Sequence, residues 1–428
     1  MLKSRLPGGL VDAGLASLAT FLVGLYAITA WSDSPELIGV YALFFSAFGM
    51  ATTLATQLIF IPAEKHVLDL GLGTRRATAV LVARRLAPAV SVCAVLVVLV
   101  PAAIVWLGGE YQEVVWPLAV TSFVVYVTSP LQDHVRRLLH LDRAAWHAAG
   151  VSAVQTVAAG IGVVVLDRLT GDPAWTAFGA LAVANVASLT VGLILAVRSA
   201  TAPSPAEGPF VDAIAVRNLA RSGAWLGSAG VFSTAVNLFV SWLVTAVAGE
   251  AALGFAEAAR TLAQPIVVVS MGLRSVYGPD SMEAAKQRDE RRAASVSNRF
   301  LLVLWPLTLV FAAVVGWNWQ GNPLADLVPA AYTVSGLIII SVLANALNGA
   351  SFPLRLELVG ADRERALFWT DGIANVAMVV TALVFAVAGS GSLFWAGAAR
   401  PAGMAAMGLG RWLLFRRAMR PWYRLVDA

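Results

Sequence analysis

The sequence has 428 residues, of which 59% are hydrophobic and only 13% are charged. Soluble domains carry roughly 25% charged residues, so this composition excludes an ordinary water-soluble protein. The 30 Lys and Arg outnumber the 25 Asp and Glu. Apolar stretches of about 20 residues recur along the chain, and backbone groups in lipid must be paired within such a stretch. The expected fold class is therefore an all-α polytopic membrane protein.

In chain order, the apolar stretches predict twelve membrane-spanning helices. The first six lie at 11–31, 37–62, 87–107, 114–133, 144–166 and 174–197, and the second six at 223–247, 252–273, 300–316, 324–353, 367–388 and 392–410. The basic N-terminus runs into the first stretch without a small-residue cleavage site, so we expect a retained span. We expect two six-helix lobes, 1–198 and 222–428, joined by a Pro-rich cytoplasmic linker at 199–221.

The positions of the basic residues predict how these helices are oriented. With the N-terminus in the cytoplasm, every Lys and Arg except Arg168, Arg260 and Arg400 lies in an inward-facing segment. This asymmetry follows the positive-inside rule, so we expect both termini in the cytoplasm. The basic segments then orient the chain and contact anionic lipid, and no nucleic-acid partner is expected.

A weak internal repeat supports the division into halves. PELIGVYAL at 35–43 has an echo in GEAALGFAEA at 249–258, and an offset of 215 residues relates Gly39 to Gly254. Each half then contains two helices, a long basic cytoplasmic segment and four more helices. An even number of spans in each half makes the repeats parallel, related by an axis along the membrane normal, with the ligand site expected between the lobes.

Two arginines, Arg260 and Arg400, lie well inside predicted spans. Each is ~12 Å from the outer end of its helix at 1.5 Å per residue. An arginine at that depth costs ~2.5–3.5 kcal/mol on insertion scales, so it should face a partner or a water-filled cavity. For Arg260 three interpretations stay open: an ion pair with Glu257, a cavity-facing cation that binds an anionic group, or a misplaced span boundary. Arg400 has no acidic neighbour in its own helix and precedes Pro401, which predicts a kink.

Other polar residues are candidates for the same cavity. Gln264 shares a helix face with Glu257 and Arg260. Polar stripes on the seventh, tenth and eleventh helices include Asn237, Asn345 and Asp371. Their alternative role is hydrogen bonding between helices, at ~0.6–2 kcal/mol per contact.

The sequence predicts no catalytic residue, metal site or cofactor. The lone cysteine, Cys93, cannot form a disulfide framework within one chain. The four histidines are not spaced as a metal-binding HExxH pair, and no phosphate-binding loop with its lysine is present. Transport, if it occurs, must be driven by a gradient, by the substrate or by a partner.

The segments DAGLASLATFLVGLYAI (12–28), SPELIGVYALFFS (34–46) and ALGFAEAARTLAQP (252–265) resemble Wzx-type polysaccharide flippases. These belong to the multidrug/oligosaccharidyl-lipid/polysaccharide exporter (MOP) superfamily. The resemblance implies two six-helix lobes, related by a pseudo-two-fold axis along the membrane normal, around a central cavity. It implies that undecaprenyl-diphosphate-linked sugars pass from the inner to the outer leaflet, with Arg260 and Arg400 in the role of cavity arginines that hold the pyrophosphate or acidic sugars. It also implies the lipid bilayer and a glycan polymerase or glycosyltransferases of the same pathway as partners. The N-terminal lobe departs from a uniformly cationic cavity, because its predicted membrane depth carries no arginine.

Two other functions are weighed against this one. A multidrug or organic-cation antiporter of the same superfamily would need acids in the cavity, for which Glu257 and Asp371 are the candidates. A membrane glycan polymerase or ligase would need a large extracytoplasmic loop, whereas the predicted outward loops are short. The chain is expected to be a transporter and not an enzyme.

Overall fold

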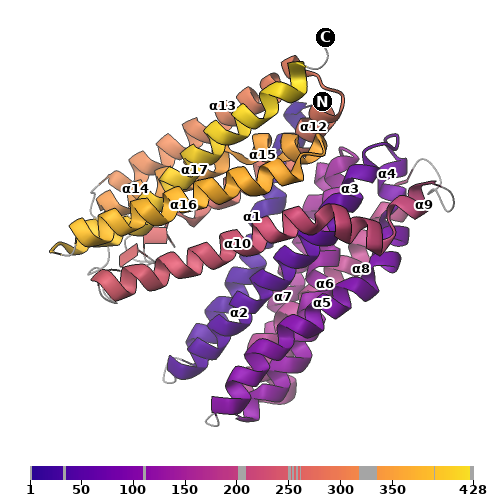
Figure 1. Ribbon diagram of the computed structural model, residues 1–428. Coiled ribbons are helices and arrows are strands. Elements are labelled where there is room, and N and C mark those ends of the chain that lie inside the picture. Colours follow the sequence, from indigo (N-terminus) through magenta and orange to yellow (C-terminus); the bar gives the residue numbers. More distant parts are fainter. Residues whose placement is uncertain are drawn as a thin grey trace. The chain divides into compact units, whose positions relative to one another are not determined.

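The structure is a computed structural model that describes residues 2–31, 35–108, 112–200, 209–248, 252, 255–256, 259–260, 262–317, 335–389 and 391–424. Within those residues the regular structure is helical throughout (Figure 1). The chain divides into two compact units, Met1–Gly227 and Ser228–Ala428. The all-α fold class predicted from the apolar stretches is thus confirmed.

Six long helices build the first unit. They are α1 (Leu2–Ala30), α2 (Pro35–Ala55), α5 (Ala79–Gly108), α6 (Val115–Leu141), α7 (Ala145–Thr170) and α8 (Pro173–Arg198). The short elements are a π-helix (Thr56–Phe60), α3 (Ile61–Val67), α4 (Thr74–Ala77), a 3-10 turn (Gln112–Val114) and α9 (Pro209–Ala213). α7 packs along α1 and α8, while α6 packs along α5 and α8.

The second unit begins within a helix, because α10 (Val216–Ala248) starts before the boundary between the units. The other helices are α12 (Gln264–Lys286), α13 (Glu290–Gly316), α14 (Ser335–Ala350), α15 (Phe352–Gly360), α16 (Glu364–Ala388) and α17 (Leu393–Arg424). α17 lies along both α16 and α14, and α12 packs against α13 and α15 (Figure 1).

Capping residues explain where several helices begin and end. The Asp172 carboxylate accepts a hydrogen bond from the Ala174 amide (2.8 Å) at the start of α8, which satisfies a backbone donor that has no partner within the helix. Asp289 caps α13 in the same way through the Arg292 amide (2.9 Å). α7 ends at Gly171, whose φ of 62° is left-handed and suits a residue without a side chain.

The helix ends preceding α7 and α16 share one backbone design. Arg143 and Asp362, which are 219 residues apart, have left-handed φ angles of 63° and 56°. The residue that follows each of them donates its N–H to a carbonyl five residues earlier, as in a Schellman motif: Ala144 to Leu139 at 2.8 Å and Arg363 to Leu358 at 2.9 Å. The same turn also occurs at Arg288 before α13, where φ is 56° and the Asp289 N–H donates to the Ala284 carbonyl at 2.9 Å. Because three helix ends adopt it, the turn does not by itself identify a repeat, and Gly254 of the sequence echo lies outside the described residues.

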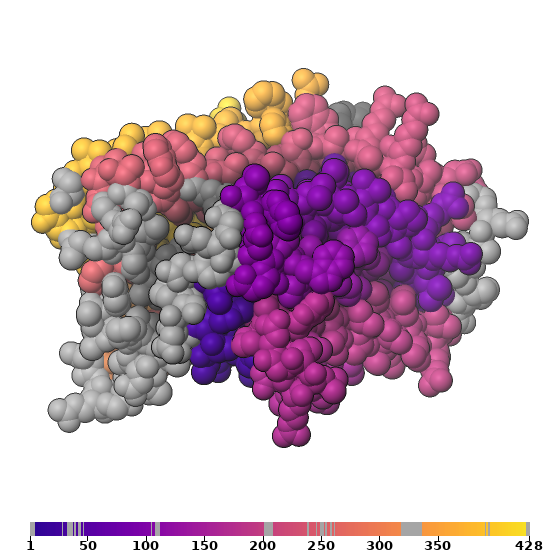
Figure 2. Space-filling view, turned by 90° about the horizontal axis from the view of Figure 1, so that it is seen from below, coloured from indigo at the N-terminus to yellow at the C-terminus, as the bar shows by residue number. Residues whose placement is uncertain are grey.

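Apolar side chains fill both the interior and much of the outer surface. In the first unit an aromatic cluster is buried between α1, α2, α6 and α8, with Trp31, Tyr41, Phe44, Tyr126 and Phe178 as members. Figure 2 shows the atoms of this unit, coloured indigo to magenta, packed closely together on one face of the molecule. Large apolar side chains are nevertheless exposed, among them Leu96, Leu107, Val157 and Ile161. Such a surface is compatible with lipid and not with water.

Nine helices in the described part of the chain are long and apolar enough to cross a membrane. They are Arg5–Ala27, Ala79–Leu107, Gln112–Leu141, Ala145–Thr170, Pro173–Arg198, Val216–Ala248, Glu290–Gly316, Gly336–Gly360 and Glu364–Ala388. The protein is therefore a polytopic membrane protein. With α2, α12 and α17, which complete the long helices of the two units, the described part contains twelve long helices.

The helices differ from the predicted spans mainly at their charged ends. The segments 134–143 and 411–428 were expected to lie outside spans, but α6 continues to Leu141 and α17 to Arg424. The predicted span 37–62 is interrupted by the π-helix that begins at Thr56. Parts of the predicted spans 252–273 and 324–353 lie outside the described residues.

Candidate functional site

The two deep arginines line the same pocket of the second unit. Arg260 precedes α12, and Arg400 lies in α17, ~10 Å from the start of that helix at 1.5 Å per residue. Ser341 and Asn345 of α14 also contribute, and the full lining is Ala256, Arg260, Ser341, Asn345, Arg400, Pro401 and Met404. Arg260 and Arg400 were expected at matching depth, and in the structure they line one pocket.

The pocket is narrow. Its volume is about 10 Å³, which is close to the space that one water molecule needs. In this form it can hold a water molecule or a single atom of a ligand, but not a sugar or a drug. It is therefore a small pocket lined by charged side chains, which a ligand could enter with only one small group.

The pocket is rich in hydrogen-bonding groups. Asn345 is buried, and its side-chain amide reaches the carbonyl oxygen of Ala263 at 3.5 Å. The buried hydroxyl of Ser341 has no hydrogen-bond partner among the described residues. Both arginines also have interactions elsewhere in the protein, so the charge of the pocket is not that of two isolated guanidinium groups.

The other residues expected at this site lie elsewhere or are not described. Glu257 lies outside the described residues, so its ion pair with Arg260 stays a prediction. Gln264, at the start of α12, is exposed and does not line the pocket. Asn237 is half-buried in α10 and donates to the carbonyl of Ser233 (2.8 Å). Of the neutral candidates, Asn345 joins Arg260 and Arg400.

Asp371 does not line this pocket but belongs to a buried polar network. Its Oδ1 accepts from Nε of Arg411 at 2.5 Å. Its Oδ2 accepts from the hydroxyl of Ser233 at 3.0 Å and lies 3.9 Å from Nη1 of Arg355. Arg411 also donates to the Asn348 side chain (2.8 Å). The negative charge of Asp371 is therefore already balanced within the protein.

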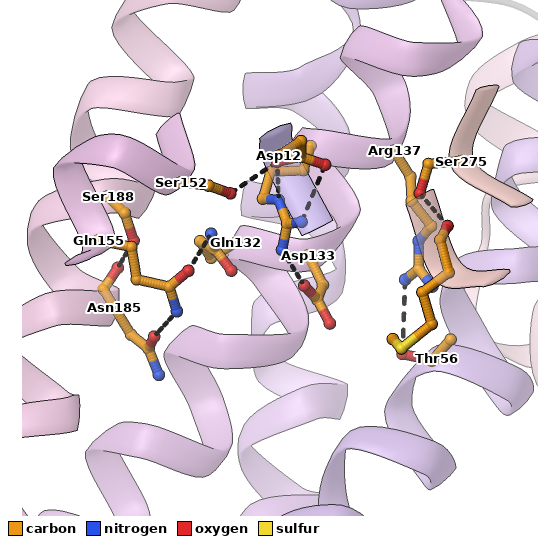
Figure 3. A network of polar contacts seen from close by, with 12 residues as sticks. Asp12, Thr56, Gln132, Asp133, Arg137, Ser152, Gln155, Asn185, Ser188 and Ser275 are labelled. Carbon is orange, nitrogen blue, oxygen red and sulfur yellow. Dashed lines mark hydrogen bonds and ion pairs between the residues drawn. The ribbon is translucent and has the colours of Figure 1, made fainter. Parts of the chain in front are cut away.

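A second buried network centres on Asp12 in the first unit. Arg136 donates to both carboxylate oxygens, from Nε at 2.9 Å and from Nη2 at 2.9 Å. Nε2 of His140 lies 2.9 Å from Oδ2, and the Ser152 hydroxyl donates to Oδ1 at 2.6 Å. Figure 3 shows Ser152 pointing toward Asp12. The bidentate geometry is the strong form of an arginine–carboxylate contact.

Arg136 lies near the end of the candidate span Gln112–Leu141, in the segment 134–143 that was expected to be cytoplasmic. The expectation that the N-terminal lobe has no arginine at membrane depth stays a prediction. The positive charge of Arg136 is offset by Asp12 and by Asp133, whose Oδ1 is 3.0 Å from Nη1 of Arg136. Arg136 therefore balances buried carboxylates, and the interior of this lobe contains both positive and negative charges.

A buried carboxylate of α3, Glu64, is balanced by α6. Nδ1 of His134 lies 2.9 Å from Glu64 Oε1, and Nε of Arg137 lies 2.9 Å from the same oxygen.

A chain of amide side chains links three helices of the first unit. Gln155 donates to Asn185 (2.8 Å) and accepts from Gln132 (3.3 Å), as Figure 3 shows. These contacts join α6, α7 and α8 through polar groups within the first unit.

Among the residues that the structure describes, no group of three or more His, Cys, Asp or Glu side chains is placed to hold a metal ion.

The fold can be compared with proteins of known structure. No protein-family model matches the sequence, and the search of curated proteins gives no match. Solved structures do match over almost the whole chain. A multidrug resistance MATE transporter of the MOP superfamily, in an outward-facing conformation, has a TM-score of 0.76 at 14% identity and covers 98% of this chain and 96% of its own. The chain has the fold of a MOP-superfamily transporter.

Two further MOP-fold structures extend this likeness. A MOP-superfamily transporter from Pyrococcus furiosus, described as having a binding pocket of reversed polarity that suggests a different function, matches with a TM-score of 0.74 at 13% identity over 98% of this chain and 96% of that one. The eukaryotic MATE transporter AtDTX14 matches with a TM-score of 0.69 at 11% identity over 99% of this chain and 98% of that one. The two-lobed helical fold that the resemblance implied is thus the fold of these solved structures.

Proposed function

We propose that the protein is a transporter of an anionic amphiphile, an undecaprenyl-diphosphate-linked oligosaccharide, which it moves from the cytoplasmic to the outer leaflet of a bacterial plasma membrane. Both termini lie in the cytoplasm in this proposal, and transport proceeds by alternating access between the two lobes. The observation that carries the proposal is the pocket that Arg260 and Arg400 share.

The chemistry of arginine supports a phosphate ligand. Each guanidinium presents donors in a planar fork that matches phosphate oxygens. A diphosphate cannot enter hydrocarbon unaided, because an ion loses its hydration there. Guanidinium groups at membrane depth offset part of that loss, while the polyprenyl chain stays in the bilayer. Ser341 and Asn345 supply further hydrogen-bonding groups next to the two arginines.

The balance of buried charge argues against an organic cation as substrate. The acid proposed for a cation site, Asp371, is already paired with Arg411. Asp12 and Glu64 of the first unit are likewise balanced by Arg136 and by Arg137 with His134. A cation would have to displace one of these partners.

A pocket of reversed polarity is ascribed to one protein of the same fold. This supports the idea that the fold accepts substrates of different charge. A multidrug antiporter is the second candidate, since a solved MATE transporter of similar fold is described as a multidrug resistance protein. The neighbours are transporters, so the proposal contains no catalytic step.

The test is transport by the purified full-length chain in proteoliposomes, with a fluorescent undecaprenyl-diphosphate sugar whose access to an external quencher is followed. We expect Arg260→Ala and Arg400→Ala each to lower the rate at least tenfold, because each removes a donor from the phosphate site. Arg260→Lys and Arg400→Lys should retain part of the rate, because the charge remains.

Arg168→Ala serves as the matched control, since this exposed arginine lies at the end of α7 and outside the pocket. It should leave the rate unchanged. Equal transport by the wild type and both pocket variants would overturn the proposal. Proton-driven efflux of a fluorescent organic cation, insensitive to both substitutions, would instead favour the multidrug antiporter.

A further inference from the structure

A second and much larger cavity lies at the other end of the second unit. Its volume is about 300 Å³, which is at the lower end of ordinary ligand sites. It is bounded by α13, by the end of α14 with α15, and by the last turns of α17. The positive-inside rule assigns this end to the cytoplasmic face. Neither the proposed transport pocket nor the ion-pair networks share a residue with this cavity.

A buried carboxylate lies deep in the cavity. Glu357 of α15 is only 3% exposed, although it lines the cavity. Its Oε2 accepts a hydrogen bond from the Tyr423 hydroxyl at 3.0 Å, and its Oε1 accepts one from Ser297 at 3.4 Å. Burial, together with the Glu357 carboxylate, raises the pKa of the Tyr423 phenol. The phenol therefore keeps its proton and remains a donor.

These two donors do not balance the charge of the carboxylate. A carboxylate offers about four acceptor positions, and both donors here are neutral hydroxyl groups. Among the described residues the ion pairs within 4 Å do not include Glu357, and a cation that acts on its charge, Arg416, lies at the rim of the cavity. A buried carboxylate is costly unless a cation neutralises it. The cavity next to Glu357 provides the space for such a cation.

The exposed rim of the cavity is net positive, with two arginines against one acid, Glu290 at the start of α13. Arg416 and Arg420 of α17 are exposed and line the cavity. They are four residues apart and so share one face of the helix. Trp412, one turn earlier on that face, also lines the cavity and lies under the Arg416 guanidinium, 5.5 Å from the ring centroid. An anionic group is thus favoured at the rim and a cationic group at the floor.

We propose that this cavity binds a phosphoethanolamine group, with its primary ammonium at Glu357 and its phosphate at Arg416 and Arg420, and that the group belongs to a phosphatidylethanolamine molecule of the cytoplasmic leaflet. A primary ammonium donates hydrogen bonds to a carboxylate, whereas a quaternary choline has no N–H to donate. Aromatic side chains at the water–lipid boundary, here Trp412 and Tyr423, suit the interfacial depth of a headgroup.

The inference is independent of the proposed transport function, because it concerns binding and not turnover. The full-length chain, purified in a mild detergent, is titrated with palmitoyl-oleoyl phosphatidylethanolamine, phosphatidylglycerol or phosphatidylcholine. Bound lipid is counted by native mass spectrometry. We expect phosphatidylethanolamine to bind at least tenfold more tightly than the other two lipids.

Three variants separate the two charged ends. Glu357→Gln keeps the shape of the side chain and should weaken phosphatidylethanolamine binding at least tenfold, with phosphatidylglycerol unaffected. Arg416→Ala combined with Arg420→Ala should abolish the preference by removing the phosphate site. Arg417→Ala is the control, because this exposed arginine lies beside Arg416 but does not line the cavity.

A cavity-filling variant keeps the test decisive if Glu357→Gln fails to fold. Ala294→Trp leaves every charged group in place but occupies the space, and it should abolish the selective binding. Unchanged selectivity in Glu357→Gln or in Ala294→Trp would overturn the site. If soluble phosphoethanolamine competes at the same concentration as the lipid, the bound group does not have to belong to a lipid, and that part of the proposal is wrong.

Discussion

Nε of Arg411 lies 2.5 Å from Oδ1 of Asp371, so a buried ion pair joins α17 to α16 within the C-terminal unit. Ser233 of α10 donates to the other carboxylate oxygen, Oδ2. The consecutive helices α16 and α17 thus meet the distant helix α10 at one carboxylate. Breaking such a pair leaves an uncompensated charge in a medium that cannot solvate it.

We therefore predict that Asp371→Asn destabilises the protein by about 3–5 kcal/mol, the range for removing one partner of a buried pair. The free energy of unfolding is measured by denaturant titration in detergent micelles. Asp212→Asn is the control, since Asp212 is exposed in α9 and should change stability by less than about 0.5 kcal/mol. A loss of less than about 1 kcal/mol for Asp371→Asn would contradict a structural role.

Because Arg136 contacts Asp12 through two hydrogen bonds, we predict that a positive charge at position 136 is not by itself enough to keep the protein fully stable. Arg136→Lys keeps the positive charge but cannot donate to both carboxylate oxygens from a planar fork. We expect a loss of about 1–3 kcal/mol in unfolding free energy. Arg85→Lys, at an exposed position of α5, should have no measurable effect. Equal stability of the two lysine variants would show that the fork geometry is unimportant.

The shared pocket predicts that Arg260 and Arg400 act on the same group. If both hold one phosphate, the second deletion costs less than the first, and the effects on binding are not additive. We expect the interaction free energy of a double-mutant cycle to be about 0.5–3 kcal/mol in magnitude. Binding of a water-soluble pyrophosphate analogue to Arg260→Ala, Arg400→Ala and the double variant gives this value. Strict additivity would mean that the two arginines bind separate groups.

Two glycines of the second unit should respond to alanine in opposite ways. A Cβ atom at Gly408 of α17 would lie 2.6 Å from the Asn348 backbone nitrogen of α14, whereas one at Gly372 of α16 would meet nothing within 4 Å. Close approach of helix backbones in a membrane depends on such small residues. We expect Gly408→Ala to destabilise by about 1–3 kcal/mol. Gly372→Ala should be neutral or stabilise by up to about 1 kcal/mol. Thermal unfolding of the two variants in one detergent compares them directly.

The hydropathy pattern predicted the helical class and the approximate positions of the long helices, because lipid permits few backbone structures. The helices extend beyond several of the predicted spans. Hydropathy reports where a helix leaves the apolar phase, not where its hydrogen bonds stop. Arg136 and Arg411 were therefore assigned to cytoplasmic segments, although α6 and α17 continue through them.

The candidate site was predicted only in part. Two arginines at equal depth in one lobe indicated a common pocket, and the structure has one. Their role in substrate binding stays a prediction. The partner of Asp371 was missed because pairing depends on which helices pack together, and periodicity within one helix cannot supply that. The sequence did contain a signal. A carboxylate inside an apolar span, such as Asp371, requires a cation, and the basic residue at the end of the neighbouring span, Arg411, is the candidate partner.

Left-handed residues precede α7, α13 and α16, at Arg143, Arg288 and Asp362. Most side chains avoid this conformation, so each of these connections depends on the backbone hydrogen bonds that hold the helix end in place. In all three places one helix stops and the next begins after only three residues, without a glycine. The sharp reversals of the chain are therefore held by the backbone and leave the side chains at these positions free to vary.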